Sequence, residues 1–242
     1  MRYELYYWPE IQGRGEFVRL ALEATAARYV DIARMPQRSG TGVSALLRII
    51  EDRAIGRPPF APPVLKAGKQ IIAQTANILL FLGQRLDLAP KSEAGRVWAH
   101  QLQLTISDLV TEVHDCHHPI GSGLYYEEQK REAKRRAADF RAERLPKFLD
   151  YFETVMKRNA SSRHCMIGSR LSYIDLSMFQ LIAGLNYAFP RTMARLKSRW
   201  PRLTALHHDV AALPRVAGYL ASPRRLPFNT QGIFRHYPEL DG

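Results

Sequence analysis

Gln74-Thr75 is the first place where residue types and order suggest chemistry, because an apolar helical pattern follows with Ile78, Leu79 and Leu82. Free N–H groups and the helix dipole at a helix N-terminus favour an anion. A threonine there is also a good N-cap on structural grounds alone. The pattern therefore predicts either an anion-binding site or a simple helix cap.

A tyrosine cluster near the N-terminus is the second such place. Tyr3, Tyr6 and Tyr7 lie in an aromatic-rich segment that Pro9 ends, as expected for a short strand. Strand alternation places Tyr3 and Tyr7 on one face and Tyr6 on the other. A hydroxyl that donates a hydrogen bond to a thiolate lowers the thiol pKa. The tyrosines are thus either strand aromatics or a source of such a hydroxyl.

Pro62-Pro63 directly precedes the apolar residues Val64-Leu65. Two prolines remove two backbone donors, so this pair does not fit an interior ladder, although a strand can begin just after it. A cis peptide bond is accessible at modest cost only before proline. The pair is therefore a candidate for a cis bond at the start of a strand.

Histidines and cysteines offer a possible metal or redox site. His114, His117 and His118 have helical spacing, but Pro119 follows at once, so we expect a helix end rather than a metal site. Cys116 and Cys165, the two cysteines, stand far apart and form no Cys-x-x-Cys pair. We expect neither a disulfide framework nor a metal.

The elements that must position these residues follow from periodicity. We expect a strand over 3–8, a helix from about 17, a strand over 29–32, a helix within 36–59, a hairpin of 64–66 with 71–73, and a helix from 75. Short connections make the first three a right-handed βαβ unit. Adding a ββα unit completes a small α/β domain over 1–87.

The rest of the chain is expected to be helical. A linker spans 87–92, and no strand pattern follows it, which predicts an all-helical domain over 93–242. Ser172 and Asp175 have the spacing of a capping box for a helix over 175–185. Aromatic residues Phe228, Phe234 and Tyr237 predict that the tail 223–242 packs, although they could instead close an apolar site.

Composition and charge limit the classes of binding partner that we expect. The chain is 46% hydrophobic, and its formal charge of +12 favours anionic partners. The densest basic segment, 130–147, pairs acids with bases at i,i+4, as Glu132 with Arg136, which is typical of a solvated helix. We therefore expect no nucleic-acid partner. No membrane span is expected, and Glu4 disfavours a signal peptide, so we expect a cytoplasmic protein.

In its order of motifs the chain resembles the cytosolic glutathione transferases over nearly its whole length. The matches are Tyr6-Tyr7-Trp8 at the end of the first strand, Pro63-Val64-Leu65 as a cis-proline strand, Gln74-Thr75 at a helix start, and Ser172-x-x-Asp175 as a buried capping box. The resemblance implies a thioredoxin-like N-terminal domain and an all-helical C-terminal domain. It is nearest to a tyrosine-type, mu- or sigma-like member of bacterial style.

This resemblance implies roles for particular residues. Tyr7 aligns with the catalytic tyrosine because it precedes Trp8, and Tyr6 is the fallback. The γ-glutamyl carboxylate of glutathione would bind at Gln74-Thr75. Arg14 matches an arginine near the glutathione site, although a surface arginine at a turn fits equally well.

At Pro62 the resemblance implies an unusual contact. The residue before the cis-proline usually offers both its N–H and its C=O to glutathione, and Pro62 has no N–H. We therefore expect only the Pro62 carbonyl to be used. Glutathione would then be held mainly by Gln74, Thr75 and nearby cations.

Three other departures from the family are visible. The loop with Pro9-Glu10-Ile11 is longer than in mu- or sigma-like members, Leu104-Thr105-Ile106 replaces an Asp-Thr-Ile that donates a carboxylate across the dimer, and Ala61 replaces a glutamine. Asp108 is a weak substitute for the carboxylate. The turn Gln12-Gly13-Arg14-Gly15 also lacks the serine or cysteine of other branches.

The function implied is conjugation of glutathione, as co-substrate, to an electrophilic apolar substrate by a homodimeric enzyme. Two alternatives stay open: reduction of a disulfide or peroxide by the same thiolate, and a binding protein that keeps the fold without turnover.

Overall fold

A computed structural model describes residues 2–242. Its N-terminal part contains a four-stranded sheet in the order β2-β1-β3-β4. The strands are β1 Tyr3–Tyr6, β2 Tyr29–Asp31, β3 Val64–Ala67 and β4 Gln70–Ala73. β1 pairs in parallel with β2 and antiparallel with β3, and β3 pairs antiparallel with β4. The parallel β1–β2 pair confirms the expected βαβ unit.

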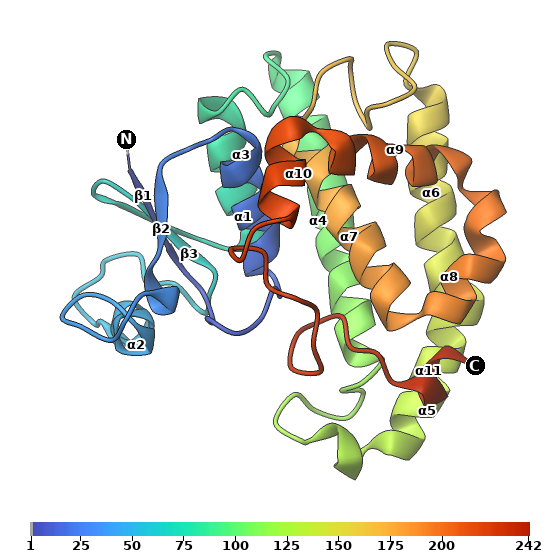
Figure 1. The fold of residues 1–242 in the computed structure, drawn as a ribbon, viewed down its shortest axis with the longest axis horizontal. Coiled ribbons are helices and arrows are strands. Elements are labelled where there is room, and N and C mark those ends of the chain that lie inside the picture. Colours follow the sequence, from blue (N-terminus) through green and yellow to red (C-terminus); the bar gives the residue numbers. More distant parts are fainter. Residues whose placement is uncertain (1) are drawn as a thin grey trace.

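Three helices cover this sheet: α1 Gly15–Ala24, α2 Val43–Glu51 and α3 Thr75–Arg85. α1 and α3 lie between the sheet and the helical part of the molecule (Figure 1). α2 packs on the opposite face, where Leu46 joins Tyr6 and Val64 in a small separate core. The large core begins on the α1 face and continues into the C-terminal helices.

The remainder is helical, as expected. The helices are α4 Glu93–Asp115, α5 Lys130–Asp139, α6 Leu145–Arg158, α7 Tyr173–Ala188, α8 Pro190–Leu196, α9 Pro201–Ala212, α10 Pro214–Leu220 and α11 Pro238–Asp241. Short 3-10 turns lie at Ile32–Arg34, Tyr126–Glu128 and Lys197–Arg199, and a π turn at Phe140–Arg144 joins α5 to α6. The predicted fold class, an α/β sheet domain followed by an all-helical part, is confirmed.

α7 begins with the capping box that the sequence predicts. The Ser172 N–H and hydroxyl both donate to Asp175 Oδ2 at 2.7 Å, and the Met166 N–H donates to Oδ1 at 2.6 Å. Asp175 therefore fixes both the start of α7 and the loop before it, in a fully buried position.

Two expectations at the sheet need adjustment. β1 ends at Tyr6, so Tyr7 and Trp8 lie in the following loop rather than in the strand. β2 ends at Asp31, because Ile32 already begins a 3-10 turn. The Pro62-Pro63 bond is cis, as expected, and β3 begins immediately after it.

The C-terminal tail packs against the helical part, as expected. It runs from α10 along α7 to α11 (red in Figure 1). Phe234 is buried against Gly184 of α7, and the rings of Tyr237 and Tyr126 stack at 3.8 Å. Within residues 2–242, no helix is both long enough and apolar enough to cross a membrane.

Candidate functional site

The Tyr7 hydroxyl lies at the N-terminus of α1. It accepts a hydrogen bond of 2.8 Å from the Arg14 N–H, and Tyr7 is 4% exposed. The close approach requires glycine on both sides of Arg14. A Cβ on Gly13 would lie 2.1 Å from Tyr7 Oη, and one on Gly15 would lie 2.5 Å from the ring. The Gly13-Arg14-Gly15 turn thus forms the surface on which the phenol of Tyr7 packs, called here the seat of Tyr7.

Electrostatics keep the Tyr7 hydroxyl protonated. Burial raises the pKa of Tyr7, and the Arg14 N–H and the charges of Arg14 and Arg19 lower it only partly. A neutral phenol that accepts one hydrogen bond still has its own proton to donate. Tyr7 is therefore equipped to donate to an anion.

Tyr6 lies on the other face of the sheet, in the α2 core, and its hydroxyl donates to Glu4 at 2.8 Å. Its proton is already used. The two tyrosines thus have different surroundings, and the geometry favours Tyr7 over Tyr6 as a donor to a ligand.

The buried side chain of Gln12 anchors the Gly13-Arg14-Gly15 turn. The sequence patterns did not predict this role. The amide of Gln12 donates to the Leu226 carbonyl at 2.5 Å and accepts from Gln180 Nε2 at 2.8 Å. Gln12 is 4% exposed. The side chain therefore ties the turn that seats Tyr7 to α7 and to the tail, across 168 and 214 residues of sequence.

A buried charge cluster lies under α1. Arg19 contacts Asp31 at 2.7 Å and Glu16 at 3.3 Å, and Arg225 of the tail contacts Glu16 at 2.6 Å. Burial alone would lower the pKa of Arg19, but the carboxylates of Asp31 and Glu16 raise it above its usual value. Since Tyr219 also donates to Glu16 at 2.5 Å, the cluster joins α1, β2 and α10.

Gln74 and Thr75 lie beside a cavity of about 390 Å³ between the start of α3 and the middle of α4. Gln74 has a φ of 69°, which is sparsely populated by non-glycine residues and is typical of functional sites. Thr75 is the first residue of α3, and its buried hydroxyl has no partner. The interpretation of Thr75 as a simple helix cap is therefore wrong.

Arg14 connects the two parts of the site. It lines this cavity, its guanidinium lies 3.4 Å from Thr111 Oγ1 of α4, and its backbone N–H reaches Tyr7. The structure thus brings Arg14, Gln74 and Thr75 to one cavity, and Tyr7 is joined to them through the Arg14 backbone. Trp8, which is 39% exposed, and the Pro62-Pro63 pair do not line the cavity.

The three histidines lie at the end of α4, as expected. His117 Nε2 contacts the Ile233 carbonyl at 2.7 Å, and His117 Nδ1 contacts His118 Nδ1 at 2.5 Å. Burial and nearby Arg235 lower the pKa of His117 to about 3 and that of His118 to about 4. Within residues 2–242, no group of His, Cys, Asp or Glu is arranged to hold a metal ion.

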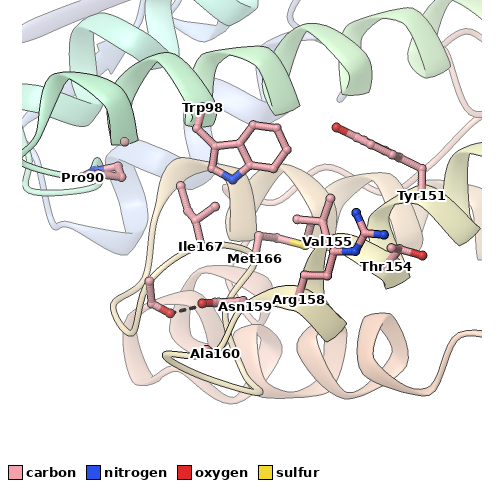
Figure 2. Close-up of a pocket in the computed structure, with 12 residues that line it drawn as sticks. Pro90, Trp98, Tyr151, Thr154, Val155, Arg158, Asn159, Ala160, Met166 and Ile167 are labelled. Atoms are coloured by element: carbon pink, nitrogen blue, oxygen red, sulfur yellow. Dashed lines mark hydrogen bonds between the residues drawn. The ribbon is translucent and has the colours of Figure 1, made fainter.

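A larger cavity of about 520 Å³ lies away from Tyr7, between α4 and α6 (Figure 2). Trp98, Tyr151, Val155 and Met166 make its wall mostly apolar, and Arg158 lies at its side. No carboxylate or thiol lines it. The hydroxyls of Tyr151 and Thr154 line it without a carboxylate, thiol or histidine to activate them, so we do not assign the active site to it.

Known proteins of one family resemble this chain. A family model described as "Glutathione S-transferase, C-terminal domain" matches residues 114–223. A glutathione S-transferase of Plasmodium falciparum is 23% identical over 90% of this chain and 94% of its own length. Glutathione S-transferase P 1 of Xenopus laevis is 24% identical over 92% of this chain and 93% of its own.

Solved structures show the same fold. The Pi-class glutathione S-transferase of Onchocerca volvulus has a TM-score of 0.72 at 21% identity, covering 96% of this chain and 99% of its own. A prostaglandin synthase D of Nilaparvata lugens has a TM-score of 0.70 at 18% identity, covering 94% of this chain and 100% of its own. Together, the match to the C-terminal domain, the relatives that cover most of the chain and the shared fold make this chain similar to the glutathione S-transferases.

Proposed function

We propose that this protein is a glutathione transferase that ionises the thiol of glutathione and conjugates it to an electrophilic, largely apolar substrate. The observation that carries the proposal is the Tyr7 hydroxyl, which is kept neutral, held by the Arg14 N–H and free to donate its own proton. The similarity to glutathione S-transferases supports this activity over disulfide or peroxide reduction and over a non-catalytic role.

Thiolate formation is the first chemical step. A free thiol with a pKa of about 8.5 is mostly protonated at neutral pH, whereas the thiolate is the nucleophile. Donation by the Tyr7 hydroxyl stabilises the thiolate, and the thiol proton goes to solvent. The thiolate then forms a bond to the electrophilic carbon of the second substrate, and the bond from that carbon to its leaving group breaks, which releases halide when the substrate is an aryl halide. Tyr7 keeps its proton throughout.

Glutathione is held along the edge between the sheet and α4. Its γ-glutamyl carboxylate binds at Gln74 and Thr75, where α3 presents free N–H groups, and Arg14 adds a positive charge. The Pro62 carbonyl accepts from the cysteinyl backbone, while cis-Pro63 shapes this segment. Trp8, next to Tyr7, lies at the thiol end.

The tyrosine-type assignment is supported by the placement of Tyr7. Similar proteins include a glutathione S-transferase P 1, a putative glutathione S-transferase alpha-5 and a Pi-class structure. The mu- or sigma-like and bacterial-style assignment therefore stays a prediction, as does the cytoplasmic location.

We also propose that the protein acts as a homodimer. Phe60, at 90% exposure, is an apolar ring without cover on the chain, and the cavity in Figure 2 is an apolar site large enough for such a ring. Burying Phe60 of a second copy there would remove both surfaces from water. Sedimentation equilibrium should give a dimer, and Phe60→Ser should shift it towards monomer; a monomeric wild-type protein contradicts the proposal.

The enzymatic proposal is tested by glutathione binding and conjugation. Calorimetry should detect glutathione binding, and a model aryl halide should be conjugated at a rate that Tyr7→Phe lowers by about 10-fold or more, because a hydrogen bond to a charged group is lost. Tyr6→Phe is the matched control and should leave the rate unchanged. Absence of glutathione binding by wild-type protein would refute the activity; equal rates in both variants would refute the role of Tyr7.

A further inference from the structure

A third cavity, of about 320 Å³, lies between α6, α7, α8 and α9. α6, α8 and α9 are on the side of the helical part that faces away from the sheet (Figure 1), and none of the candidate glutathione-site residues lines this cavity. Its volume is at the lower end of the range for small-molecule sites. Five buried apolar residues form its inner wall: Leu149, Ile182, Met193, Trp200 and Leu203. The cavity is therefore an apolar space for a small molecule, apart from the candidate glutathione site.

The mouth of this cavity carries a free positive charge. Asn186, Ala194, Lys197 and His208 line the cavity and are exposed, so they mark its mouth. None of the ion pairs within residues 2–242 includes Lys197, and no carboxylate lines the cavity. An unpaired ammonium group beside an apolar space favours a ligand that has an apolar body and one anionic end.

His207, which also lines the cavity, adds a hydrogen-bond donor without adding a charge. Its half-buried ring stacks on Phe179 of α7 at 4.9 Å. Burial, with the nearby charges of His208 and Arg225, lowers the pKa of His207 to about 4, so the ring is neutral at neutral pH. A neutral imidazole carries one N–H donor. His207 can therefore donate to an anion that Lys197 attracts.

The acidic side chains of α6 that lie near this wall have other partners. Asp150 accepts from Arg199 Nε at 2.8 Å and from Trp200 Nε1 at 2.8 Å. Glu153 accepts from the Leu203 N–H at 3.2 Å. Because neither acid lines the cavity, Lys197 is left for an anion that enters it.

We propose that this cavity binds a small apolar carboxylate that takes no part in the conjugation reaction. Its hydrocarbon body lies against the buried wall beside Trp200, where burial removes apolar surface from water. Lys197 pairs with the carboxylate at the mouth, and His207 donates a hydrogen bond to it. Because the carboxylate stays at the exposed mouth, it keeps part of its hydration, and binding does not require an isolated buried ion.

Octanoate and 1-octanol test this proposal, because they share an apolar chain and differ in charge. By calorimetry, wild-type protein should bind one octanoate per chain, about 3- to 5-fold more tightly than octanol, which is the contribution of an exposed ion pair. Lys197→Gln should bind octanoate only as tightly as octanol and leave the affinity for octanol unchanged. Lys197→Arg keeps the charge and should keep the preference for octanoate.

Two further variants locate the ligand. Lys147 is exposed on α6 and does not line the cavity, so Lys147→Gln removes the same charge and should bind both ligands like wild type. Ala194→Trp places an indole ring at the mouth and should abolish binding of both ligands. Since Ala194 is exposed, the ring does not enter the packed core, and urea unfolding of this variant should match that of wild type.

Several results would overturn the proposal. Wild-type protein that binds no octanoate, or that binds octanoate and octanol equally, lacks the proposed site. If Lys147→Gln weakens octanoate binding as much as Lys197→Gln does, only the net charge of the protein attracts the anion. If Ala194→Trp binds octanoate like wild type, the ligand occupies another place. Each of these results leaves the proposed conjugation activity untouched, because the cavity shares no residue with the glutathione site.

Discussion

The two ends of the candidate glutathione site differ in how their buried polar groups are satisfied. At the thiol end, Tyr7 has the Arg14 N–H, and both atoms of the Gln12 amide have partners. At the α3–α4 cavity, Thr75, His100 and Gln103 each have a buried atom without one. The chain itself therefore holds the Tyr7 hydroxyl and the Gln12 amide, although Gln180 Oε1, Arg19 Nη2 and Asp31 Oδ1 nearby are buried without a partner. In the cavity, the unpaired atoms belong to residues that line the space a ligand would enter.

This difference explains what each end contributes. The hydrogen bond from the Arg14 N–H holds the Tyr7 hydroxyl in one place, which is what stabilisation of a developing anion requires. A cavity with unpaired groups gains hydrogen bonds on binding, and therefore contributes to affinity and selectivity. Changes at the thiol end should affect stability or rate, and changes in the cavity should affect ligand affinity.

The largest effect near the thiol end is expected from Arg19→Met. It removes the cation that pairs with Asp31, of which 10% of the side chain is exposed. Breaking a buried ion pair by removing one partner costs about 3–5 kcal/mol of unfolding free energy. Urea unfolding should measure this loss directly.

Arg224→Met is the matched control for Arg19→Met. Arg224 pairs with Glu23 but is 58% exposed, so its loss should cost no more than about 1 kcal/mol. Equal costs for the two substitutions would show that the buried cluster does not hold α1 in place.

Gly13→Ala tests whether the seat of Tyr7 must be this tight. Gly13 has a φ of 46°, and an added Cβ would lie 2.1 Å from Tyr7 Oη, so the hydroxyl must move. A displacement of about 1 Å in a catalytic group can cost about 100-fold in rate. We expect kcat/KM for conjugation to fall to that extent, while glutathione affinity changes much less.

The control for Gly13→Ala is Gly123→Ala, because no atom lies within 4 Å of a Cβ at that position. Its kinetics should match those of wild type. A Gly13→Ala enzyme with unchanged kcat/KM would mean that the observed position of the Tyr7 hydroxyl is not needed for turnover.

Gln12→Ala should have the smallest effect of the three. It leaves the Leu226 carbonyl and Gln180 Nε2 without their partner, which should lower the unfolding free energy by about 1–2 kcal/mol. Thermal and urea unfolding measure the loss, with Gln101→Ala, at an exposed position of α4, as control. No loss of stability would show that the tail does not help to hold the turn.

Local sequence patterns predicted the parts of the fold that depend on neighbouring residues. The capping box of Ser172 and Asp175 and the cis bond at Pro62-Pro63 were both confirmed. Gln74-Thr75 was placed correctly at the start of α3, but its cap interpretation was wrong, because only the structure shows that the Thr75 hydroxyl is unpaired.

Such local patterns could not predict contacts between residues that are far apart in the sequence. Gln12 acquires its role only by meeting Leu226 and Gln180, and His100 and Gln103 line the cavity only because α4 packs beside α3. A glutamine or histidine on a helix carries no local sign of such a contact. The Gly13-Arg14-Gly15 sequence was the one available signal of a close approach.

The pKa of the glutathione thiol in the bound complex tests the central claim most directly. Spectrophotometric titration of the thiolate should give a value below the free thiol value of about 8.5, and Tyr7→Phe should raise it by about 1–2 units, because one charge-assisted hydrogen bond is lost. Thiolate should therefore predominate above the bound pKa, and conjugation should decline as pH falls through it. Tyr6→Phe should leave the value unchanged. An identical bound thiol pKa in wild type and Tyr7→Phe would contradict the account.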